Sequence, residues 1–528
     1  MKTAVRLSAV CAFASLIAGC GGGSGTLLDG SSPSPSATTA EQPVNSKWGH
    51  WFHQADTVLV TVGGNGSVTS SPAGIDCTGS SGCPKSFPVG STVTLSPFAT
   101  VVAGTGGTTG SGGTTSSGSS QASTTKTPAS APQLISPAIY VSPTGSDSNN
   151  GQSASAPFLT LEKAQTAMQG SSTKVVYLMG GTYARTTMLW LTTADAGESW
   201  LGYPEQTPIL DGGGTLATAI AVEGNNITIR WLTIQNVVNT GILAGNAVSS
   251  GGGGGVSGVL IDSNTIKNIY STGWSQAAIR AYGFNNGRIS HNLIRNANYC
   301  GIIVLASSGS TQIITNLTIE YNAIYDTMKT VADGGAIYVQ DVPHLSTGIT
   351  INNNIIGNYG SPTNQSKAIY FDDEMSNVTA KNNIVYGTGS FAFQIHGGNN
   401  NVFENNIFDI SGAAQLGIYQ YSSGNPNYGM SGNVITCNIV YSSSAPPYSL
   451  WYSELQSNDV PPTVSKNLYW DTSAALHNTG SVVDALPTVG NPDFVNPSQA
   501  NYAFASTPPS FCAFAPIDTS QVGPVPNP

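Results

Sequence analysis

Carboxylates are the residues of this chain best suited to chemistry, and they are scarce. Only 8% of the 528 residues are Asp, Glu, Lys or Arg, against about 25% in average soluble domains. Five acidic residues nevertheless gather in two short segments: Asp333, Asp341, Asp372, Asp373 and Glu374. Two carboxyl groups about 5–5.5 Å apart suit a retaining glycosidase, and about 6.5–9.5 Å suits an inverting one. The four aspartates are our candidate catalytic residues.

Crowding of carboxylates raises the pKa of one member of a pair, as an acid catalyst requires. Two other interpretations stay open. The segments are also typical of Asp-rich turns that accept backbone hydrogen bonds, or of a Ca²⁺ site. We expect neither a resident cofactor nor a metal, with Ca²⁺ as the alternative.

A short repeat predicts the elements that must position these residues. The pattern apolar-x-apolar-x-x-Asn-x-apolar returns at intervals of 23 to 32 residues, and an earlier copy has Leu232 in place of the asparagine. Its asparagines are Asn264, Asn292, Asn322, Asn354, Asn383, Asn406, Asn438 and Asn467. Stacked asparagines can bond one another, whereas an unpaired buried polar group costs about 1–3 kcal/mol. The repeat predicts an all-β fold, a right-handed parallel β-helix of about nine or more coils.

A second alternation in each coil predicts one outward face. Side chains of a strand alternate between its two faces. We expect an inward stack of Ile279, Ile302, Ile337, Ile369, Phe393 and Ile418. The outward columns are then Arg280, Ile303, Tyr338, Tyr370, Gln394, Tyr419 and Tyr282, Leu305, Gln340, Asp372, His396, Tyr421. Asp341 and Asp373 lie beside them, one coil apart. This alignment places Asp341 over Asp373 near the retaining distance, while Asp333 against Asp372 fits either distance.

The outward columns suit a sugar polymer. Coils stack at about 4.8 Å, so Tyr338, Tyr370 and Tyr419 form a broken aromatic ladder beside carboxylates and amides. Flat rings and polar groups match the C–H patches and hydroxyls of sugars. The candidate substrate-binding residues are Tyr282, Tyr338, Tyr370, Gln394, His396, Tyr419 and Tyr421. In the alternative interpretation, the ladder only stabilises the solenoid.

The charge balance limits the partners. With 17 basic and 27 acidic residues, the formal net charge is −10. This excess of negative charge argues against a nucleic acid or an anionic membrane bound by charge. We expect a monomer whose partner is a polysaccharide or another glycan.

The first 20 residues form a targeting segment. Lys2 and Arg6 precede an apolar stretch, 7–18, which is too short to span a bilayer comfortably, and Ser15-Leu16-Ile17-Ala18-Gly19-Cys20 resembles a bacterial lipoprotein signal. The resemblance implies a lipid on Cys20 and an outer-membrane lipoprotein that faces the periplasm or the cell surface. An ordinary signal peptide is the alternative.

Composition divides the chain. We expect a signal peptide at 1–19, a tether at 20–48, a small antiparallel β module at 49–102, a Gly/Ser/Thr linker at 103–136 and the β-helix at 137–528. The module resembles the internalin-related B-repeats of bacterial surfaces. Cys77 and Cys83 lie in a Gly/Ser turn, and export permits their disulfide. Cys300, Cys437 and Cys512 show no zinc pattern and are expected to be small buried fillers.

Several motifs resemble a known group. Asp333-Gly334-Gly335-Ala336-Ile337-Tyr338, Ile369-Tyr370-Phe371-Asp372-Asp373 and Ile395-His396-Gly397-Gly398 resemble motifs of the β-helical glycoside-hydrolase-like proteins of the pectate lyase superfamily, as do the closing segments Pro492–Pro497 and Pro516–Asp518. The resemblance covers roughly 137–525. It implies a glycan-active site with Asp333, Asp372 and Asp373 at the matching acidic positions.

Three functions follow from these observations. The first is a surface-anchored glycoside hydrolase with paired carboxylates. The second is a polysaccharide lyase, in which Lys329 with Arg280 or Arg295 supplies the base and acid. The third is a non-catalytic adhesin or glycan-binding scaffold.

Overall fold

The computed structural model describes strands at 56–60, 67–71, 76–78, 83–87 and 94–98, and residues 134–527 except 246–254, 275, 307–311, 413, 420–428, 444–449, 456, 458, 472–481 and 508–509. The chain divides into two compact units, Met1–Pro128 and Ala129–Pro528. Cys20 and Tyr421 lie outside the described residues, so their predicted roles stay predictions. Within the described residues, no helix combines the length and apolar character needed to span a membrane.

The first unit contains the small antiparallel module that the sequence predicts. Strand β1 (Asp56–Val60) pairs with β4 (Cys83–Phe87), and β2 (Ser67–Ser71) pairs with both β3 (Asp76–Thr78) and β5 (Thr94–Phe98), all antiparallel. The side chains of Cys77 and Cys83 lie outside the described part of the chain. Their disulfide stays a prediction.

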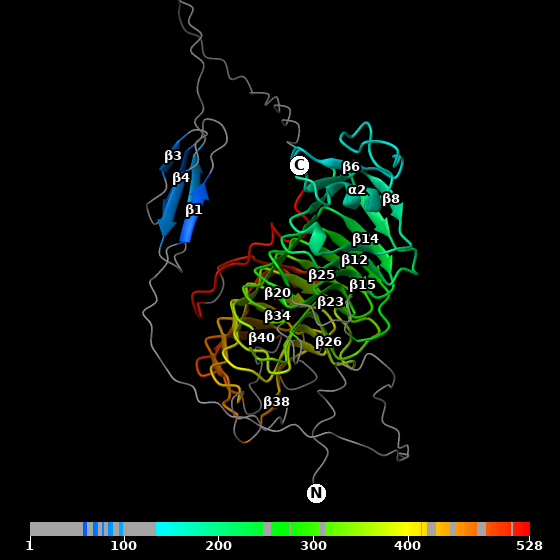
Figure 1. Cartoon of the computed structure of the whole chain (residues 1–528). Coiled ribbons are helices and arrows are strands. Elements are labelled where there is room, and N and C mark those ends of the chain that lie inside the picture. The colour runs from blue at the N-terminus through cyan, green and yellow to red at the C-terminus, as the bar shows by residue number, and fades with distance from the viewer. Residues whose placement is uncertain are drawn as a thin grey trace, which may run out of the picture. The chain divides into compact units, whose positions relative to one another are not determined.

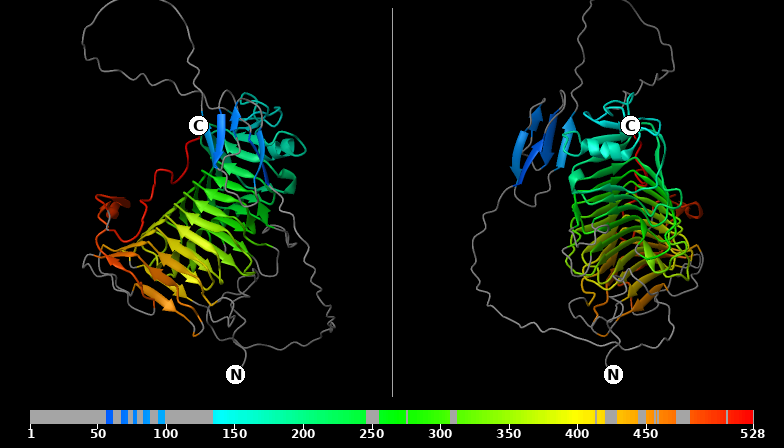
Figure 2. Two further views of the ribbon diagram at one scale, coloured as in Figure 1. Left: turned by 90° about the vertical axis from the view of Figure 1, so that its left-hand side faces the viewer. Right: turned by 45° about the vertical axis from the view of Figure 1, so that its right-hand side comes forward.

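The second unit is a solenoid of three long parallel sheets (Figures 1 and 2). The first sheet consists, in order along the solenoid, of β6 (Ile139–Val141), β7 (Val175–Leu178), β10 (Ser199–Gly202), β13 (Thr228–Arg230), β17 (Leu260–Asp262), β21 (Arg288–Ser290), β24 (Thr318–Glu320), β27 (Ile349–Asn352), β30 (Val378–Lys381), β33 (Val402–Glu404), β36 (Val434–Thr436) and β39 (Thr463–Ser465).

The second sheet runs beside the first. It consists of β8 (Gly181–Ala184), β11 (Pro208–Asp211), β14 (Thr233–Val237), β18 (Thr265–Ile269), β22 (Leu293–Ala297), β25 (Ala323–Tyr325), β28 (Ile355–Gly357), β31 (Ile384–Tyr386), β34 (Ile407–Asp409), β37 (Ile439–Tyr441), β40 (Leu468–Trp470) and β41 (Thr488–Val489).

The third sheet has the longest strands and supports the outward face predicted above. It consists of β9 (Leu189–Leu191), β12 (Thr218–Val222), β15 (Thr240–Ala244), β19 (Ala277–Tyr282), β23 (Cys300–Ala306), β26 (Gly334–Asp341), β29 (Ser366–Asp372), β32 (Phe391–His396), β35 (Gln415–Tyr419) and β38 (Trp451–Glu454). A short extra pair, β16 (Val256–Ser257) and β20 (Phe284–Asn285), flanks the solenoid.

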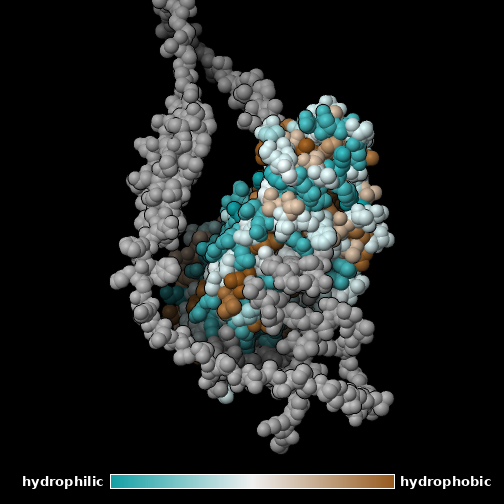
Figure 3. Space-filling view, viewed as in Figure 1, coloured by the Kyte–Doolittle hydropathy of each residue, from teal (hydrophilic) through white to brown (hydrophobic). Residues whose placement is uncertain are grey.

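The chain visits the first, second and third sheets in turn, as in β24, β25 and β26, and pairs each strand in parallel with the corresponding strand one coil later. Parallel connections of this kind are right-handed. The predicted fold, an all-β right-handed parallel β-helix, is confirmed. On the face shown in Figure 3, hydrophilic and neutral residues surround small hydrophobic patches.

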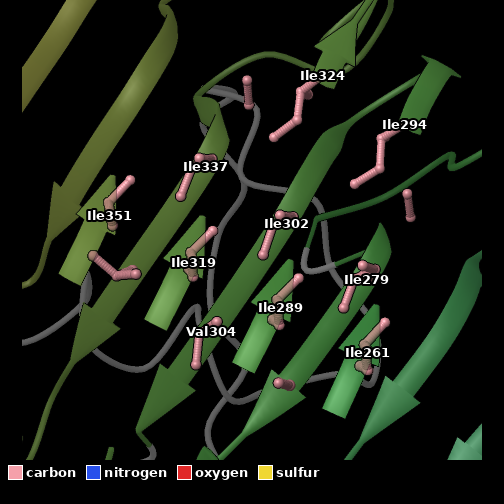
Figure 4. Packing of buried hydrophobic residues seen from close by; sticks show 14 of the residues in the cluster. Ile261, Ile279, Ile289, Ile294, Ile302, Val304, Ile319, Ile324, Ile337 and Ile351 are labelled. Atoms are coloured by element: carbon pink, nitrogen blue, oxygen red, sulfur yellow. The ribbon is translucent and has the colours of Figure 1, made fainter. Parts of the chain in front are cut away.

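Isoleucine stacks fill the centre of the solenoid (Figure 4). Ile279, Ile302 and Ile337 of the third sheet are partners in register and fully buried. The stack continues through Ile369 to Phe393, as predicted. Because β-branched side chains pack well on a pleated surface, the repeated isoleucines explain why each coil adds one layer to a continuous core.

The asparagines form the predicted ladder. In each coil the Nδ2 group donates to Oδ1 of the next asparagine, from Asn264 to Asn467, at 2.9–3.1 Å. The ladder ends at Asp484, whose Oδ2 accepts from Asn467 Nδ2 at 2.8 Å. At the other end the backbone N–H of Leu232 donates to Asn264 Oδ1. Each side-chain amide thereby forms hydrogen bonds with buried polar groups of neighbouring turns, which would otherwise have no partner.

Further elements flank the three sheets near the two ends of the solenoid. Helix α2 (Leu161–Met168) buries Leu161, Ala164 and Met168 and is capped by Thr160. It is followed by the 3-10 turn η1 (Thr193–Asp195). At the other end, β42 (Phe494–Asn496), η3 (Pro497–Gln499) and β43 (Asn501–Phe504) form a hairpin against the outer side of the second sheet.

The last residues run back along the solenoid, where Figure 2 shows them in red. Ala515 exchanges two hydrogen bonds with the side chain of Asn405, and the backbone N–H of Gly523 donates to Tyr321 O at 2.8 Å. Asn527 Nδ2 donates to Gly202 O at 3.0 Å, near the first coils. We name residues 511–527 the return segment.

A disulfide fixes the start of the return segment and corrects one prediction. Cys437 and Cys512 are bonded, with Cα atoms 5.8 Å apart, whereas the sequence suggested two separate buried fillers. The two residues are 75 positions apart, so spacing alone gave no sign of their pairing. Cys300 is buried and unpaired, as predicted.

Candidate active site

The outward face of the third sheet carries the predicted columns. Arg280, Ile303, Tyr338, Tyr370 and Gln394 are successive partners in register. The same column extends in both directions, to Trp190, Ala221 and Leu243 before Arg280 and to Gly417 and Tyr452 after Gln394. In the neighbouring column, Tyr282, Leu305, Gln340 and Asp372 follow one another.

The predicted alignment of β35 with β32 is wrong by two residues. A register shift between Phe391 and Phe393 aligns Ile418 with Ile395 and Tyr419 with His396, so Gly417 instead of Tyr419 follows Gln394. Because the side-chain period of a strand is 2, a shift of two keeps inward residues inward. The side chain of Tyr419 is not among those described, so its predicted sugar contact stays a prediction.

Asp372 is the centre of a hydrogen-bonded cluster. Its Oδ2 accepts from the Tyr338 hydroxyl at 2.6 Å, and its Oδ1 accepts from the Tyr370 hydroxyl at 2.9 Å. His396 Nδ1 lies 2.5 Å from the same Oδ1. The carboxylate is only 9% exposed. Three side chains from three successive strands, β26, β29 and β32, therefore meet at one carboxylate.

The cluster stabilises Asp372 as an anion. Burial alone would raise the pKa of Asp372, but the hydrogen bond and positive charge of His396, with the Tyr338 hydroxyl and Lys367, outweigh burial and lower that pKa to about 2. In return, the bond to Asp372 and its charge outweigh burial at His396 and raise the pKa of the imidazole. Asp372 and His396 form a buried ion pair.

Asp373 has the opposite character. Burial, and next the negative charge of Asp372, raise the pKa of Asp373 to about 7. Its Oδ2 accepts a hydrogen bond from Gln340 Nε2, and its side chain is partly exposed. One carboxylate oxygen of each aspartate and a ring nitrogen of His396 lie within 4.8 Å of one another. Near neutral pH, a protonated acid thus stands beside an anion.

The tyrosine ladder positions this pair. The rings of Tyr338 and Tyr370 stack with centroids 5.0 Å apart, and Tyr370 and His396 stack at 6.4 Å. Tyr370 is 4% exposed, so its ring faces are covered by neighbours and its hydroxyl points to Asp372. Burial, and then the charge of Asp372, raise the pKa of Tyr370 well above its usual range. Of the predicted ladder, Tyr338 and Tyr370 hold the carboxylate in place.

Asp333 lies on the same face, paired with a residue that the sequence analysis missed. Lys367 Nζ is 2.6 Å from Asp333 Oδ1 and 4.2 Å from the centroid of the Tyr370 ring. Lys367 is 2% exposed, while the Asp333 side chain keeps 44% of its surface exposed. Lys367 forms a further column with Gly335 and Phe391. Strict alternation would have assigned Lys367 to the core, because it lies two residues before the inward Ile369, so the sequence pattern gave no sign of this pair.

Asp341 does not join the cluster. It is 1% exposed and opposes Ala306, a core residue. Its Oδ2 accepts from the backbone N–H of Ser346 at 2.7 Å, which makes it the turn-capping type of aspartate. The predicted contact with Asp373 is made by Gln340 instead. The alternation of β26 explains this, because Val339 points inward and Asp341 is two residues further on.

The remaining candidates lie around the cluster. Glu374, 7% exposed, forms an ion pair with His344 at 3.3 Å, and His344 is a second residue that the sequence analysis missed. Gln394 is buried beside Tyr370, and its Oε1 has no hydrogen-bond partner among the described residues. Arg280 lies 4.6 Å from the centroid of the Tyr282 ring, and burial lowers the pKa of Arg280 to about 10.

The residues predicted for a lyase have other partners in the structure. Lys329 Nζ contacts Asn296 Oδ1 at 2.5 Å, and Arg295, on the second sheet, pairs with Asp326 at 3.8 Å. Arg280 is on the third sheet. The assignment of base and acid to these residues stays a prediction.

Ca²⁺, the metal that the sequence analysis considered, fits the cluster poorly. Asp372, Asp373 and His396 offer ligand atoms within 4.8 Å of one another. Both oxygens of Asp372, however, already accept hydrogen bonds from tyrosines. A nitrogen ligand also does not suit Ca²⁺, which takes six to eight oxygens. No step below is routed through a metal.

Comparisons with known proteins agree with this architecture. A family model described as a right-handed β-helix region matches residues 218–445. Among solved structures, the chain is similar to a lacto-N-biosidase of family GH136 from Eubacterium ramulus, at 11% identity over 66% of this chain and 67% of that one, with a TM-score of 0.50. A comparison with curated protein sequences finds no match.

Two further solved structures are less similar. The complex of XylC with xylose shares 10% identity over 68% of this chain and 87% of that one, with a TM-score of 0.42. The A-module of the mannuronan C-5 epimerase AlgE6 from Azotobacter vinelandii shares 15% identity over 62% and 94%, with a TM-score of 0.41. At these identities the comparisons establish a right-handed β-helix protein and nothing finer.

Proposed function

We propose that this chain is a glycoside hydrolase that acts through Asp372 and Asp373. The observation that carries the proposal is the pair itself: a partly exposed carboxyl within 4.8 Å of a buried carboxylate, on the outward face of the solenoid. The lacto-N-biosidase that shares the fold supports a carbohydrate substrate.

Asp373 is the acid in this proposal. Glycoside hydrolysis requires a proton for the leaving oxygen, and a carboxyl whose pKa is raised to about 7 holds that proton at neutral pH. After the leaving group departs, the same group as a carboxylate removes a proton from the attacking water.

Asp372 is the nucleophile. One oxygen of Asp372 lies within 4.8 Å of one oxygen of Asp373, which favours the short separation of about 5–5.5 Å of retaining enzymes over the longer one of inverting enzymes. The bonds from Tyr338, Tyr370 and His396 lower the pKa of Asp372 to about 2, so the carboxylate is a good leaving group from a glycosyl ester. The same three donors orient it toward the sugar. Retention of the anomeric configuration follows.

The test is product release from neutral and anionic polysaccharides by the purified chain and by Asp373→Asn. Release of reducing ends without ultraviolet absorbance, lost in the variant, is the expected result. Release accompanied by absorbance near 235 nm, roughly the band of an unsaturated uronate, would establish a lyase. Retention of a polymer without any release would indicate a glycan-binding scaffold. Both outcomes contradict the proposal.

We also propose that the chain is a monomeric outer-membrane lipoprotein anchored through Cys20. The motif that ends at Cys20 supports this. Metabolic labelling with a fatty acid should mark the chain, and Cys20→Ala should abolish the label. An unchanged label in the variant would contradict the anchor.

A further inference from the structure

A second aromatic site lies on the outer side of the second sheet, away from Asp372. Tyr441 of β37 and Trp470 of β40 are partners in register on neighbouring strands. Val440 and Tyr469, which adjoin them in sequence, belong to the inward core, so Tyr441 and Trp470 point outward. Strands in a sheet lie about 4.8 Å apart, so the two aromatic side chains project side by side from neighbouring strands, and both line one cavity.

The closing hairpin covers most of this face but leaves these two side chains partly exposed. Tyr502 covers Tyr386, with ring centroids 5.8 Å apart, and its hydroxyl donates to Asp409 Oδ2 at 2.8 Å. Phe494 packs edge-on against Tyr441 at 5.5 Å. Beside Trp470 the described residues leave a cavity of about 370 Å³. Its lining consists of Tyr441, Trp470, Asn491, Asp493, Phe494 and Pro497.

The polar groups of the cavity stand on one rim. Asn491 and Asp493 are exposed, and both are fixed in place. Asn491 Oδ1 accepts from the backbone N–H of Asp493 at 2.9 Å, and Asp493 Oδ2 accepts from the Ser506 hydroxyl at 2.7 Å. An aromatic floor with a carboxylate and an amide on its rim matches a ligand that has an apolar face and hydroxyl groups at its edge.

The volume and the charge of the cavity limit the class of ligand that it can bind. The volume lies at the lower end of the range for small-molecule sites, about 300–1,000 Å³, and suits one or two sugar rings. None of the six lining residues is basic. The Asp493 carboxylate attracts hydroxyl donors and repels a uronate or sulfate group.

We propose that this cavity is a second glycan-binding site, which holds one or two rings of a neutral sugar chain by stacking on Trp470 and Tyr441. The site is not catalytic. It keeps the polymer on the solenoid while the third sheet acts on another part of it. The idea of a shared polymer rests on the proposed function, whereas binding in the cavity does not.

The test measures retention in native affinity gels that contain xylan, galactomannan or arabinogalactan as neutral probes, and alginate or polygalacturonate as anionic probes. Full-length Asp373→Asn serves as the parent, so that cleavage does not remove the probe. Trp470→Ala is compared with Trp274→Ala, a matched loss of an exposed tryptophan, 57% exposed, outside the cavity. We expect at least one neutral polymer to retain the parent and Trp274→Ala, and Trp470→Ala to bind it about tenfold more weakly.

Three results would overturn the inference. They are equal retention of Trp470→Ala and Trp274→Ala, no retention of a folded parent by any neutral polymer, and preferential retention by the anionic polymers. A second variant, Asp493→Asn, should weaken neutral binding and reduce the preference for neutral over anionic polymers, because the carboxylate that repels anions is gone. Turnover of a short soluble oligosaccharide should be the same in wild type and Trp470→Ala. If Asp373→Asn still turned over substrate, the proposed function would be wrong. The comparison of the two tryptophan variants would still show whether the cavity binds a glycan.

Discussion

Asp372 and Asp373 are neighbours in the chain but opposite in protonation, because Tyr338, Tyr370 and His396 donate to the first and only Gln340 donates to the second. The first is an anion with its pKa lowered to about 2, and the second keeps a proton because its pKa is raised to about 7. This difference underlies the first four predictions.

Asp373→Asn should lower kcat by about 10²–10⁴-fold, the usual contribution of an acid–base group. An amide preserves the hydrogen bond with Gln340 but has no proton to transfer to the leaving oxygen. Steady-state rates on the polymer found to be a substrate would check this. Asp326→Asn, at a carboxylate of the second sheet paired with Arg295, is the control and should stay active. A kcat within threefold of wild type in Asp373→Asn would exclude it as the acid.

The activity should fall as the pH rises through about 7, where Asp373 loses its proton. The acidic limb should lie far lower, because Asp372 stays ionised down to about pH 2. A profile of kcat/KM against pH would show a broad plateau on the acidic side. If activity increased above pH 7, Asp373 would have to work as a base in the first step.

Tyr338→Phe should raise the pKa of Asp372, because it removes the 2.6 Å bond to Oδ2. A hydrogen bond to a charged group contributes about 1.5–3 kcal/mol, which corresponds to a shift of about one to two pH units. The acidic limb of the pH profile should move upward by that amount. Tyr270→Phe, which removes an exposed hydroxyl bonded to Asn236, should leave the limb where it is. A purely structural role of Tyr338 would lower stability without this displacement.

Stability should depend on pH through Asp373 with a definite sign. The folded chain keeps the Asp373 proton up to about pH 7, whereas an unfolded aspartate releases it near pH 4. Between these values the folded state binds more protons, so the free energy of unfolding decreases as the pH rises. Urea titrations at pH 4.5 and 7 should show a smaller decrease for Asp373→Asn than for wild type. Parallel decreases would mean that the folded pKa is close to its ordinary value.

Asn354→Ala should destabilise the solenoid by about 2–4 kcal/mol. The Asn354 Oδ1 accepts from both the backbone and the side chain of Asn322, and its Nδ2 donates to Asn383 and Ile319. Each buried group left unpaired costs about 1–3 kcal/mol. Asn352→Ala, two residues away and half-buried, removes one bond to Glu320 and should cost less than about 1 kcal/mol. Equal midpoints of thermal unfolding for the two variants would contradict the ladder's contribution.

The sequence predicted the fold well because each copy of the repeat corresponds to one coil of the solenoid. A buried asparagine every coil and an isoleucine at each inward position are visible as a pattern, and they determine which residues share a face. The same alternation placed Tyr338, Tyr370 and Asp372 on one outward surface. The alternation also explains why Asp341 faces the core. Asp341 directly follows Gln340, which points outward, so its own side chain points inward.

What the sequence did not predict depends on local departures from that pattern. Asp373 has φ of 45°, and this left-handed turn lets it share a face with its neighbour. The register of β35 differs by two residues from the predicted alignment, the pairing is irregular between Phe391 and Phe393, and no residue type marks this departure. Lys367 and His344 pair with acids one coil away in space but more than 20 residues away in sequence. The Cys437–Cys512 bond likewise joins segments that only the folded return segment brings together.

The return segment also changes how the solenoid can come apart. In a simple stack each coil touches only its neighbours, so the ends can peel away independently. Here residues near the C-terminus hold Gly202, Tyr321 and Asn405 along one strip. Fraying of the early coils therefore requires the tail to detach first, which couples distant layers into a single cooperative transition. Because the tail finishes beside the first coils, the two ends of this unit lie at one pole, and tension between them would not stretch the stack.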